Sequence, residues 1–303
     1  MKKSILLSVC MVTIMASAYC GGAISAEPVN VQEIELENID TILVHYNSER
    51  ITLLKNNTNT ITLKEYMSIN NSSHYAQISN SGNELVIKAG RRPAMRNFRA
   101  HVEIFIPVSN KNITIRTSSG NITGENEYTA STMNFNSSSG DISINSITAN
   151  NIKFTASSGN IQCNNTNGNT FIKTNSGNII FNSVNGDVSS ESSSGRIEIK
   201  QTTGSLTANT SSGNINCSIT ENAGDVSITT SSGSVILAIP ENFAFNFLSR
   251  TSSGRLRTPF SDKLSSPLTD RDSVQGIIGE NTKEPKNINI RTNSGSITVN
   301  WIN

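Results

Sequence analysis

Four arginines lie close together in the first third of the chain: Arg91, Arg92, Arg96 and Arg99. A guanidinium group binds phosphate or carboxylate oxygens through two parallel hydrogen bonds, so a cluster of arginines favours an anionic partner. These four residues are therefore a candidate contact for phosphate or carboxylate groups on a polymer of the cell envelope. The alternative is a solvated loop between two strands, in which the charges bind nothing.

Two aspartates, Asp187 and Asp225, each directly follow a glycine at equivalent places in the repeat described below. At the usual strand spacing their carboxyl groups would lie about 9.6 Å apart, near the upper limit for the acid and base of an inverting glycosidase. Ser205 takes the same place between them, and the repeats contain no histidine. We favour turn capping and predict no catalytic residues, with a polysaccharide-active β-helix enzyme as a remote alternative.

Metal and cofactor chemistry has little support in the sequence. Cys163 and Cys217 lie three repeats apart, about 14 Å at the usual strand spacing, too far for a disulfide or a shared zinc ion. Calcium-binding β-rolls have aspartate-rich nonapeptides, whereas acidic residues are sparse here. A formal net charge of +1 gives no indication of nucleic-acid binding. We predict no metal, no cofactor and no nucleic-acid partner, and we expect both cysteines to be small core residues.

The strongest pattern in the chain is a recurring Ser-Gly dipeptide, preceded in every copy by Ser or Asn. The glycines lie 18 to 21 residues apart, except for a last step of 41, and each is followed two residues later by Ile, Val or Leu. A fixed period of this length indicates one structural unit stacked on copies of itself. The repeat glycines are Gly120, Gly140, Gly159, Gly177, Gly195, Gly213, Gly233, Gly254 and Gly295.

Apolar residues at alternate positions between turn residues predict short strands, and a second set of corners divides the unit into halves of nine residues. These corners carry Gly168, Gly186, Gly204 and Gly224. We predict an all-β fold, a parallel β-solenoid of about 18-residue coils with stacked aliphatic side chains inside. Asn, Ser and Thr side chains should form hydrogen-bonded ladders between coils, and the corner glycines should be needed for positive φ angles.

Threonines recur at one offset in the repeat, at Thr174, Thr210 and Thr230. A flat, exposed ladder of threonines would suit ice binding. Ala156 and Ser192 interrupt the series at the same offset, so the sequence gives ice binding little support.

The repeat suggests a division of the chain into an export signal at 1–26, a β-rich N-terminal cap at 27–115 and solenoid repeats at 116–303. The cap would cover the first open edge of the solenoid. A proline-containing segment at about 255–287 should form a loop or cap, and 287–302 should return as the closing coil. Strands are expected in the N-terminal cap at Ile34–Glu37, Thr41–His45, Ile51–Leu54, Thr60–Leu63, Glu84–Lys88 and Ala100–Pro107.

The N-terminus resembles an export signal, with Lys2 and Lys3 before an apolar run and then Ala16-Ser17-Ala18, a cleavage pattern. A second interpretation places a lipid on Cys20, although Tyr19 is large for the position before a lipidated cysteine. No later segment is apolar enough for a transmembrane helix. We therefore expect an exported protein at the cell surface, in the periplasm or in the medium.

The stretch Val102–Pro107, followed by Ile113-Thr114-Ile115-Arg116-Thr117-Ser118-Ser119-Gly120-Asn121-Ile122, resembles a bacterial family of unknown function. That family is usually labelled "putative adhesin", and in it a β-rich leader runs into Ser-Gly-[Asn/Asp]-Ile repeats. The resemblance covers nearly all of the chain after the signal. It implies a β-solenoid and a role at the cell surface or envelope, and it carries no catalytic or binding residues.

Together, the repeats and the resemblance predict an exported, non-enzymatic β-solenoid that binds an unknown glycan or protein at the cell surface or envelope. A scaffold or stress-sensing protein of the periplasm or envelope is the alternative. The two functions predict the same sequence, so only the location or the partner can separate them.

Overall fold

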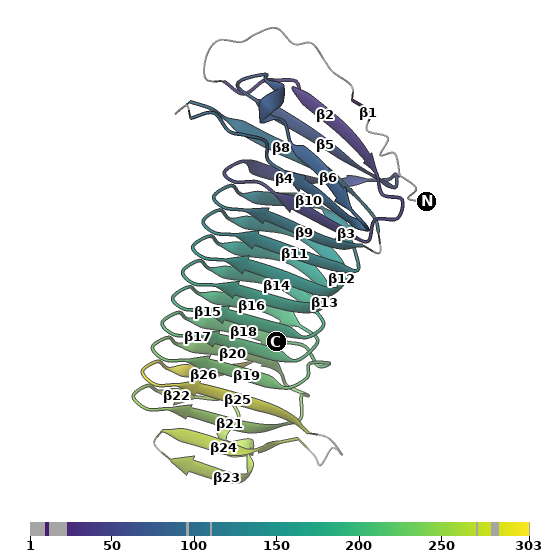
Figure 1. Ribbon diagram of the computed structural model, residues 1–303. Coiled ribbons are helices and arrows are strands. Elements are labelled where there is room, and N and C mark those ends of the chain that lie inside the picture. The colour runs from purple at the N-terminus through teal and green to yellow at the C-terminus, as the bar shows by residue number, and fades with distance from the viewer. Residues whose placement is uncertain are drawn as a thin grey trace. The chain divides into compact units, whose positions relative to one another are not determined.

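The computed structural model describes residues 10–11, 23–94, 97–109, 111–270, 272–279 and 285–302. In this part of the chain the fold is all-β, with two short 3-10 helices and no α-helix. The chain divides into two compact units, Met1–Asn150 and Asn151–Asn303, each described below by itself (Figure 1). Most of the expected export signal, with Cys20, lies outside the described residues, as does Arg96.

The N-terminal unit contains two series of strands, and most pairs within each series are parallel. One series runs β6, β7, β3, β9, β11, and the other runs β2, β5, β8, β4, β10, β12. Its elements are β1 (Cys10–Met11), β2 (Asn30–Glu35), β3 (Thr41–His45), β4 (Arg50–Asn56), β5 (Thr60–Met67), η1 (Ser72–His74), β6 (Gln77–Ser81), β7 (Glu84–Lys88), β8 (Ala100–Pro107), β9 (Asn112–Thr117), β10 (Ile122–Thr129), β11 (Thr132–Ser137) and β12 (Ile142–Ala156), which extends past the division at Asn150.

The region expected to be an N-terminal cap instead adds to the stack of coils, because its strands β3 and β4 pair in parallel with β9 and β10. The strands expected at Thr41–His45, Glu84–Lys88 and Ala100–Pro107 have the expected bounds. The strand expected at Ile34–Glu37 is instead β2, four residues earlier at its start, and β6 was not foreseen. Serine and asparagine dominate β6, and all but one of its side chains are exposed, so it lacks an apolar alternation.

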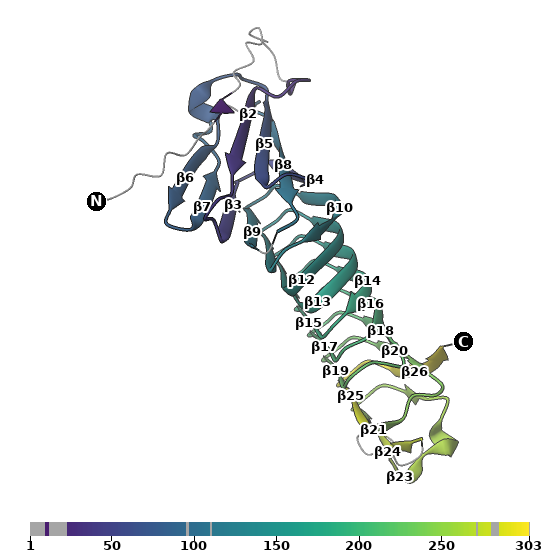
Figure 2. The same cartoon turned by 90° about the vertical axis from the view of Figure 1, so that its right-hand side faces the viewer.

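In the C-terminal unit each coil contributes one strand to each of two parallel ladders (Figure 2). Side chains at equivalent positions therefore stack, and Ile161, Ile179, Ile197, Ile215, Val235 and Ile297 form one fully buried column. The elements are β13 (Ile161–Thr174), β14 (Ile179–Asn185), β15 (Val188–Ser192), β16 (Ile197–Thr202), β17 (Leu206–Thr210), β18 (Ile215–Ile219), β19 (Val226–Thr230), β20 (Val235–Pro240), β21 (Phe245–Thr251), β22 (Leu256–Arg257), η2 (Ser261–Lys263), β23 (Ser265–Asp270), β24 (Ser273–Ile278), β25 (Lys286–Thr292) and β26 (Ile297–Ile302).

The repeat glycines are required by close packing, and the expectation of positive φ is wrong at their corners but confirmed at Gly168 and Gly186 of the second set of corners. Among the described residues, only Gly82, Gly168, Gly186 and Gly279 have positive φ as glycines. At Gly213 an added Cβ would lie 1.9 Å from the carbonyl oxygen of Gly195 in the preceding coil, which no side chain tolerates. At most of these corners a serine or threonine three residues earlier completes the turn: Thr210 Oγ1 accepts a hydrogen bond from Gly213 N at 3.1 Å, whereas Ala156 takes this place before Gly159.

The side-chain ladders between coils are confirmed. Asn182 Nδ2 donates to Asn164 Oδ1 at 2.8 Å, and Asn185 Nδ2 donates to Asn167 Oδ1 at 3.1 Å, each pair being 18 residues apart. Thr174, Thr210 and Thr230 are buried inside the coil, so they cannot form the exposed ladder that ice binding needs.

The last coil in the sequence is not the last coil in the stack. β25 pairs with both β19 and β21, and β26 pairs with both β20 and β22. The coil formed by β25 and β26 therefore lies between two coils that precede it in the chain, where Figure 1 shows it in yellow. We call it the intercalated coil; it takes the place of the closing coil expected from the sequence.

The segment expected to be a loop or cap contains a β-hairpin. β23 and β24 are antiparallel, and β24 pairs with β21 at the outer edge of that ladder. Phe245 and Phe247 are buried against Phe260 at ring-centroid distances of 5.5 and 5.0 Å. The three rings form an aromatic cluster in the core beside the hairpin.

Candidate functional site

The corner between β3 and β4 carries Glu49 where later coils have glycine. Ser118 N and Ser119 N donate to Asn47 O, as Ser138 N and Ser139 N donate to Ser118 O one coil further on. An added Cβ at Gly120 would meet Glu49 O at 1.8 Å, as one at Gly140 would meet Gly120 O at 1.9 Å. Glu49, Gly120 and Gly140 therefore stack in one column of corner residues, and Glu49 is its first member in the N-terminal unit.

The Glu49 carboxylate holds the arginine-rich loop. It accepts hydrogen bonds from Asn47 N and Ser48 N at 2.9 and 3.0 Å, and its other oxygen pairs with Arg92 Nε. Arg92 also donates to the carbonyl oxygen of His74. With its side chain only 15% exposed, Arg92 mainly fixes the loop. Arg91 and Arg99 are exposed, and the candidate polymer contact remains a prediction for them.

A second buried carboxylate, Glu65 on β5, lies next to this ion pair. Its oxygens accept hydrogen bonds from Asn30 Nδ2, Ala76 N and Tyr46 Oη at 2.8, 2.7 and 3.2 Å. Burial raises the pKa of Glu65, and the hydrogen bonds and the nearby Arg92 charge lower it only in part. The pKa of Tyr46 is raised well above its ordinary value, first by burial and then by Glu65.

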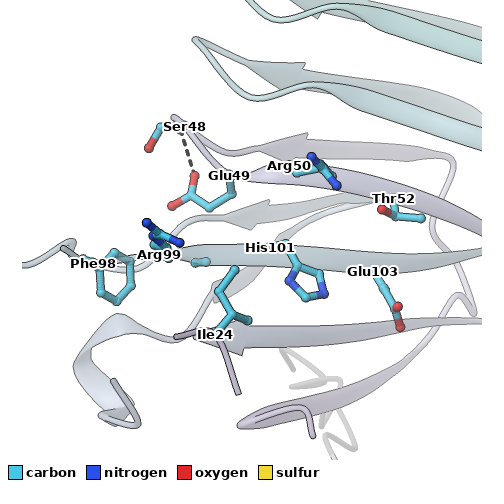
Figure 3. A pocket seen from close by; sticks show the side chains of 10 residues that line it. Ile24, Ser48, Glu49, Arg50, Thr52, Phe98, Arg99, His101 and Glu103 are labelled. Carbon is cyan, nitrogen blue, oxygen red and sulfur yellow. Dashed lines mark hydrogen bonds between the residues drawn. The ribbon is translucent and has the colours of Figure 1, made fainter. Parts of the chain in front are cut away.

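A pocket of about 600 Å³ opens beside the arginine-rich loop on the outward face of β8 and β4 (Figure 3). Parallel pairing places Arg50 opposite His101, and Arg99 precedes β8, so three basic side chains line one hollow. Ser48 and Thr52 contribute hydroxyl groups, and Phe98 contributes an apolar wall; Ile24, which also lines the hollow, belongs to the segment expected to be the export signal. We call this hollow the Arg50 pocket.

The acidic residues of the Arg50 pocket already have partners. Glu49 pairs with Arg92, and Glu103 accepts a hydrogen bond from Tyr66 Oη at 2.9 Å. The Tyr66 ring also stacks on His101 at 4.3 Å between centroids. Within the described part of the chain, neither Arg50 nor Arg99 forms an ion pair. The pocket therefore offers two free guanidinium groups to an anion.

The pKa values of His101 and Tyr66, the two ionisable rings on this face, are both shifted away from neutral pH. Burial lowers the pKa of His101, and Arg50 lowers it further, against the opposing effect of Glu103. Burial and the hydrogen bond to Glu103 raise the pKa of Tyr66 to about 12. The lowered pKa favours the neutral form of His101, so the positive charge of the pocket comes mainly from its arginines.

A family model for Toastrack DUF4097 matches residues 39–300, which is most of the chain. The chain belongs to the Toastrack DUF4097 family. The match extends over parts of both compact units and includes β3 and β4, so every lining residue of the Arg50 pocket except Ile24 lies within the Toastrack region. No curated protein matches this Toastrack chain.

Several solved structures resemble this Toastrack chain weakly. A "putative adhesin" from Bacteroides fragilis has 13% identity and a TM-score of 0.42, over 90% of this chain and 96% of that one. A "putative lipid binding protein" from Parabacteroides distasonis has 13% identity and a TM-score of 0.41, over 91% and 98%. A "putative cell adhesion protein" from Clostridium sporogenes has 11% identity and a TM-score of 0.22, over 90% and 98%. Because these scores are low, the family membership rests on the family model.

The other residues considered from the sequence have structural partners in the Toastrack fold. Asp187 Oδ1 accepts from Ser205 N, and Asp225 Oδ1 accepts from Asn287 N, both at 2.8 Å, as turn capping predicts. Cys163 and Cys217 are buried in one column, neither in a disulfide with another described residue, and burial raises the pKa of each thiol to about 12. No group of three metal-ligating side chains occurs among the described residues. In that same part of the chain, no helix has the length and apolar character to cross a membrane.

The raised pKa of Glu65 predicts a pH-dependent stability. Above the ordinary pKa of 4.5, the folded chain holds a proton that the unfolded chain has released, so the free energy of unfolding should fall as pH rises through this range. Glu65→Gln should remove this part of the slope, because its amide does not titrate. Urea unfolding of both proteins from about pH 4 to pH 8 measures the difference.

Glu35→Gln, an exposed position on β2, is the control for that experiment and should keep the wild-type pH profile. A constant stability difference between the wild-type protein and Glu65→Gln at every pH would contradict the raised pKa.

Proposed function

We propose that this Toastrack protein is an exported, non-enzymatic binding protein of the cell surface or envelope. Its Arg50 pocket would hold an anionic group, a carboxylate or phosphate, of a glycan or protein. The observation that carries the proposal is the pair Arg50 and Arg99, exposed at one pocket and without an acidic partner among the described residues. Guanidinium groups without partners in a hollow surface are suited to bidentate anion binding.

The names of the similar structures agree with a binding role, since two refer to adhesion and one to lipid binding. A non-enzymatic role is supported by the Asp187 and Asp225 contacts, which use the carboxylates as hydrogen-bond acceptors between coils. The export signal expected at 1–26 supports action outside the cytoplasm, and a lipid on Cys20 is the minor alternative for how the chain would be held there.

Binding of labelled polygalacturonate, a carboxylate polymer, tests the pocket. Arg50→Ala/Arg99→Ala should weaken binding by about tenfold or more, because two charge-assisted contacts are lost. The control variant Arg116→Ala/Arg250→Ala removes the same charge from exposed positions outside the pocket and should bind like the wild-type protein. Equal weakening by both variants, or no binding by the wild-type protein, would contradict the pocket.

Protease treatment of intact cells tests the location. Loss of the protein before lysis supports the cell surface and an adhesin. Protection until lysis supports the alternative, a periplasmic or envelope scaffold or stress sensor.

A further inference from the structure

A second basic pocket lies on the C-terminal unit, over the outward face of β22 and β26. It has a volume of about 410 Å³ and is lined by Arg255, Arg257, Ser253, Ser294, Ser296 and Thr298, together with Gly254. The register of the two strands places Arg257 beside Thr298 and Leu256 beside Ile297, which belongs to the buried column. Arg255 and Arg257 therefore point outwards from the same face, and both are exposed.

The lining of this pocket contains hydroxyl groups and two cations, with no acidic and no aromatic side chain. Ser296 Oγ accepts a hydrogen bond from Arg255 N at 3.3 Å, which ties the arginine strand to the hydroxyl-bearing strand. In the described part of the chain, neither guanidinium group forms an ion pair. Among the described residues, β22 pairs with β26.

Comparison with another coil of the same unit shows what is unusual here. Arg196 follows its repeat glycine directly and pairs with Glu198 two residues later. Arg255 occupies the place of Arg196, and Arg257 occupies the place of Glu198. The coil at Gly254 thus keeps an arginine in the first position and has a second arginine where the earlier coil has glutamate. Neither Arg255 nor Arg257 has a counter-ion within this strand, so an anion from outside can neutralise them.

We infer that Arg255 and Arg257 form an anion-binding site for an acidic glycan, one that carries sulfate, phosphate or carboxylate groups. Arg255, directly before β22, and Arg257, within it, lie about 6.6 Å apart along the backbone, so their guanidinium groups can each bind oxygens of neighbouring anionic groups. The four hydroxyl side chains match the hydrogen-bonding groups of sugar rings. The lining offers no aromatic ring for a nucleic-acid base.

The test compares binding of a dextran sulfate oligosaccharide with that of neutral dextran, by calorimetry at physiological salt. All proteins carry Arg50→Ala/Arg99→Ala, so that the Arg50 pocket does not contribute and the two sites are tested separately. We expect the sulfated sugar to bind and the neutral sugar not to bind. Adding Arg257→Glu, which recreates the pattern of Arg196 and Glu198, should weaken binding by about tenfold or more without lowering the melting temperature.

Arg250→Glu is the matched control, because it makes the same charge change on an exposed residue of the other ladder, in β21. It should leave the dissociation constant for dextran sulfate unchanged. Equal weakening by Arg250→Glu would show diffuse attraction and overturn the site. Absence of dextran sulfate binding would overturn it too, as would binding to phosphatidylglycerol vesicles in place of the sulfated sugar.

Discussion

Ile179→Asp should abolish the cooperative unfolding transition of residues 151–303. Ile179 is fully buried between Ile161 and Ile197 in the column that runs through the C-terminal unit. The substitution removes about 1.5–3 kcal/mol of apolar burial and places an unpaired carboxylate inside the coil, which costs several kcal/mol more. The sum approaches the whole stability of a typical domain, about 5–15 kcal/mol. Amide hydrogen exchange resolves the effect by segment.

The neighbouring residue supplies a matched control. Ile180 points outwards from β14, so Ile180→Asp introduces the same carboxylate at the next position on the solvent side. We expect the stability of this variant to fall by at most about 1 kcal/mol, because the new carboxylate lies opposite the like-charged Glu198. If Ile179→Asp kept the wild-type melting temperature, the assignment of this column to the core would be wrong.

Gly213→Ala should destabilise the C-terminal unit by about 3 kcal/mol or more, since the methyl group would overlap a backbone carbonyl that cannot turn aside. The new Cβ would lie 1.9 Å from Gly195 O and 3.0 Å from Thr210 Oγ1, the two groups that connect successive corners. Chemical unfolding followed by circular dichroism measures the loss.

Two further variants separate close packing from backbone conformation. Ser212→Ala, at the exposed residue before the corner, should change stability by no more than about 0.5 kcal/mol. Gly82 has a φ of 66° and nothing within 4 Å of an added Cβ, so Gly82→Ala should cost only backbone strain, about 1 kcal/mol. A loss at Gly213 as small as that at Gly82 would contradict the close approach.

The repeat predicted the fold because each coil carries its own pattern of corner and buried column. The extra coil of the leader was missed because Asn47-Ser48-Glu49 does not resemble Ser-Ser-Gly. One signal could have found it: Ile42 and Ile51 are nine residues apart, as are their partners Ile113 and Ile122. The corner residues of this coil differ from Ser-Ser-Gly, whereas the nine-residue spacing of its buried isoleucines is the same as in the next coil.

The candidate sites depend on which residues of two paired strands lie opposite each other, and short sequence patterns do not predict this register. Arg50 and His101 are distant in the sequence, and only the pairing of β4 with β8 brings them together. The arginine cluster identified from the sequence included Arg92, whose partner Glu49 belongs to a coil that was not recognised. The order of the last coils was equally hidden, because Val235, Ile297 and Leu256 are similar enough to stack in any order.

The intercalated coil has a consequence for folding during synthesis. A solenoid whose coils stack in chain order can grow by adding each new coil to the end as it emerges. Here β21 and β22 leave the ribosome before their stacking neighbours β25 and β26 exist. The final part of the C-terminal unit must therefore wait for the intercalated coil, so assembly there cannot proceed one coil at a time from the N-terminal side.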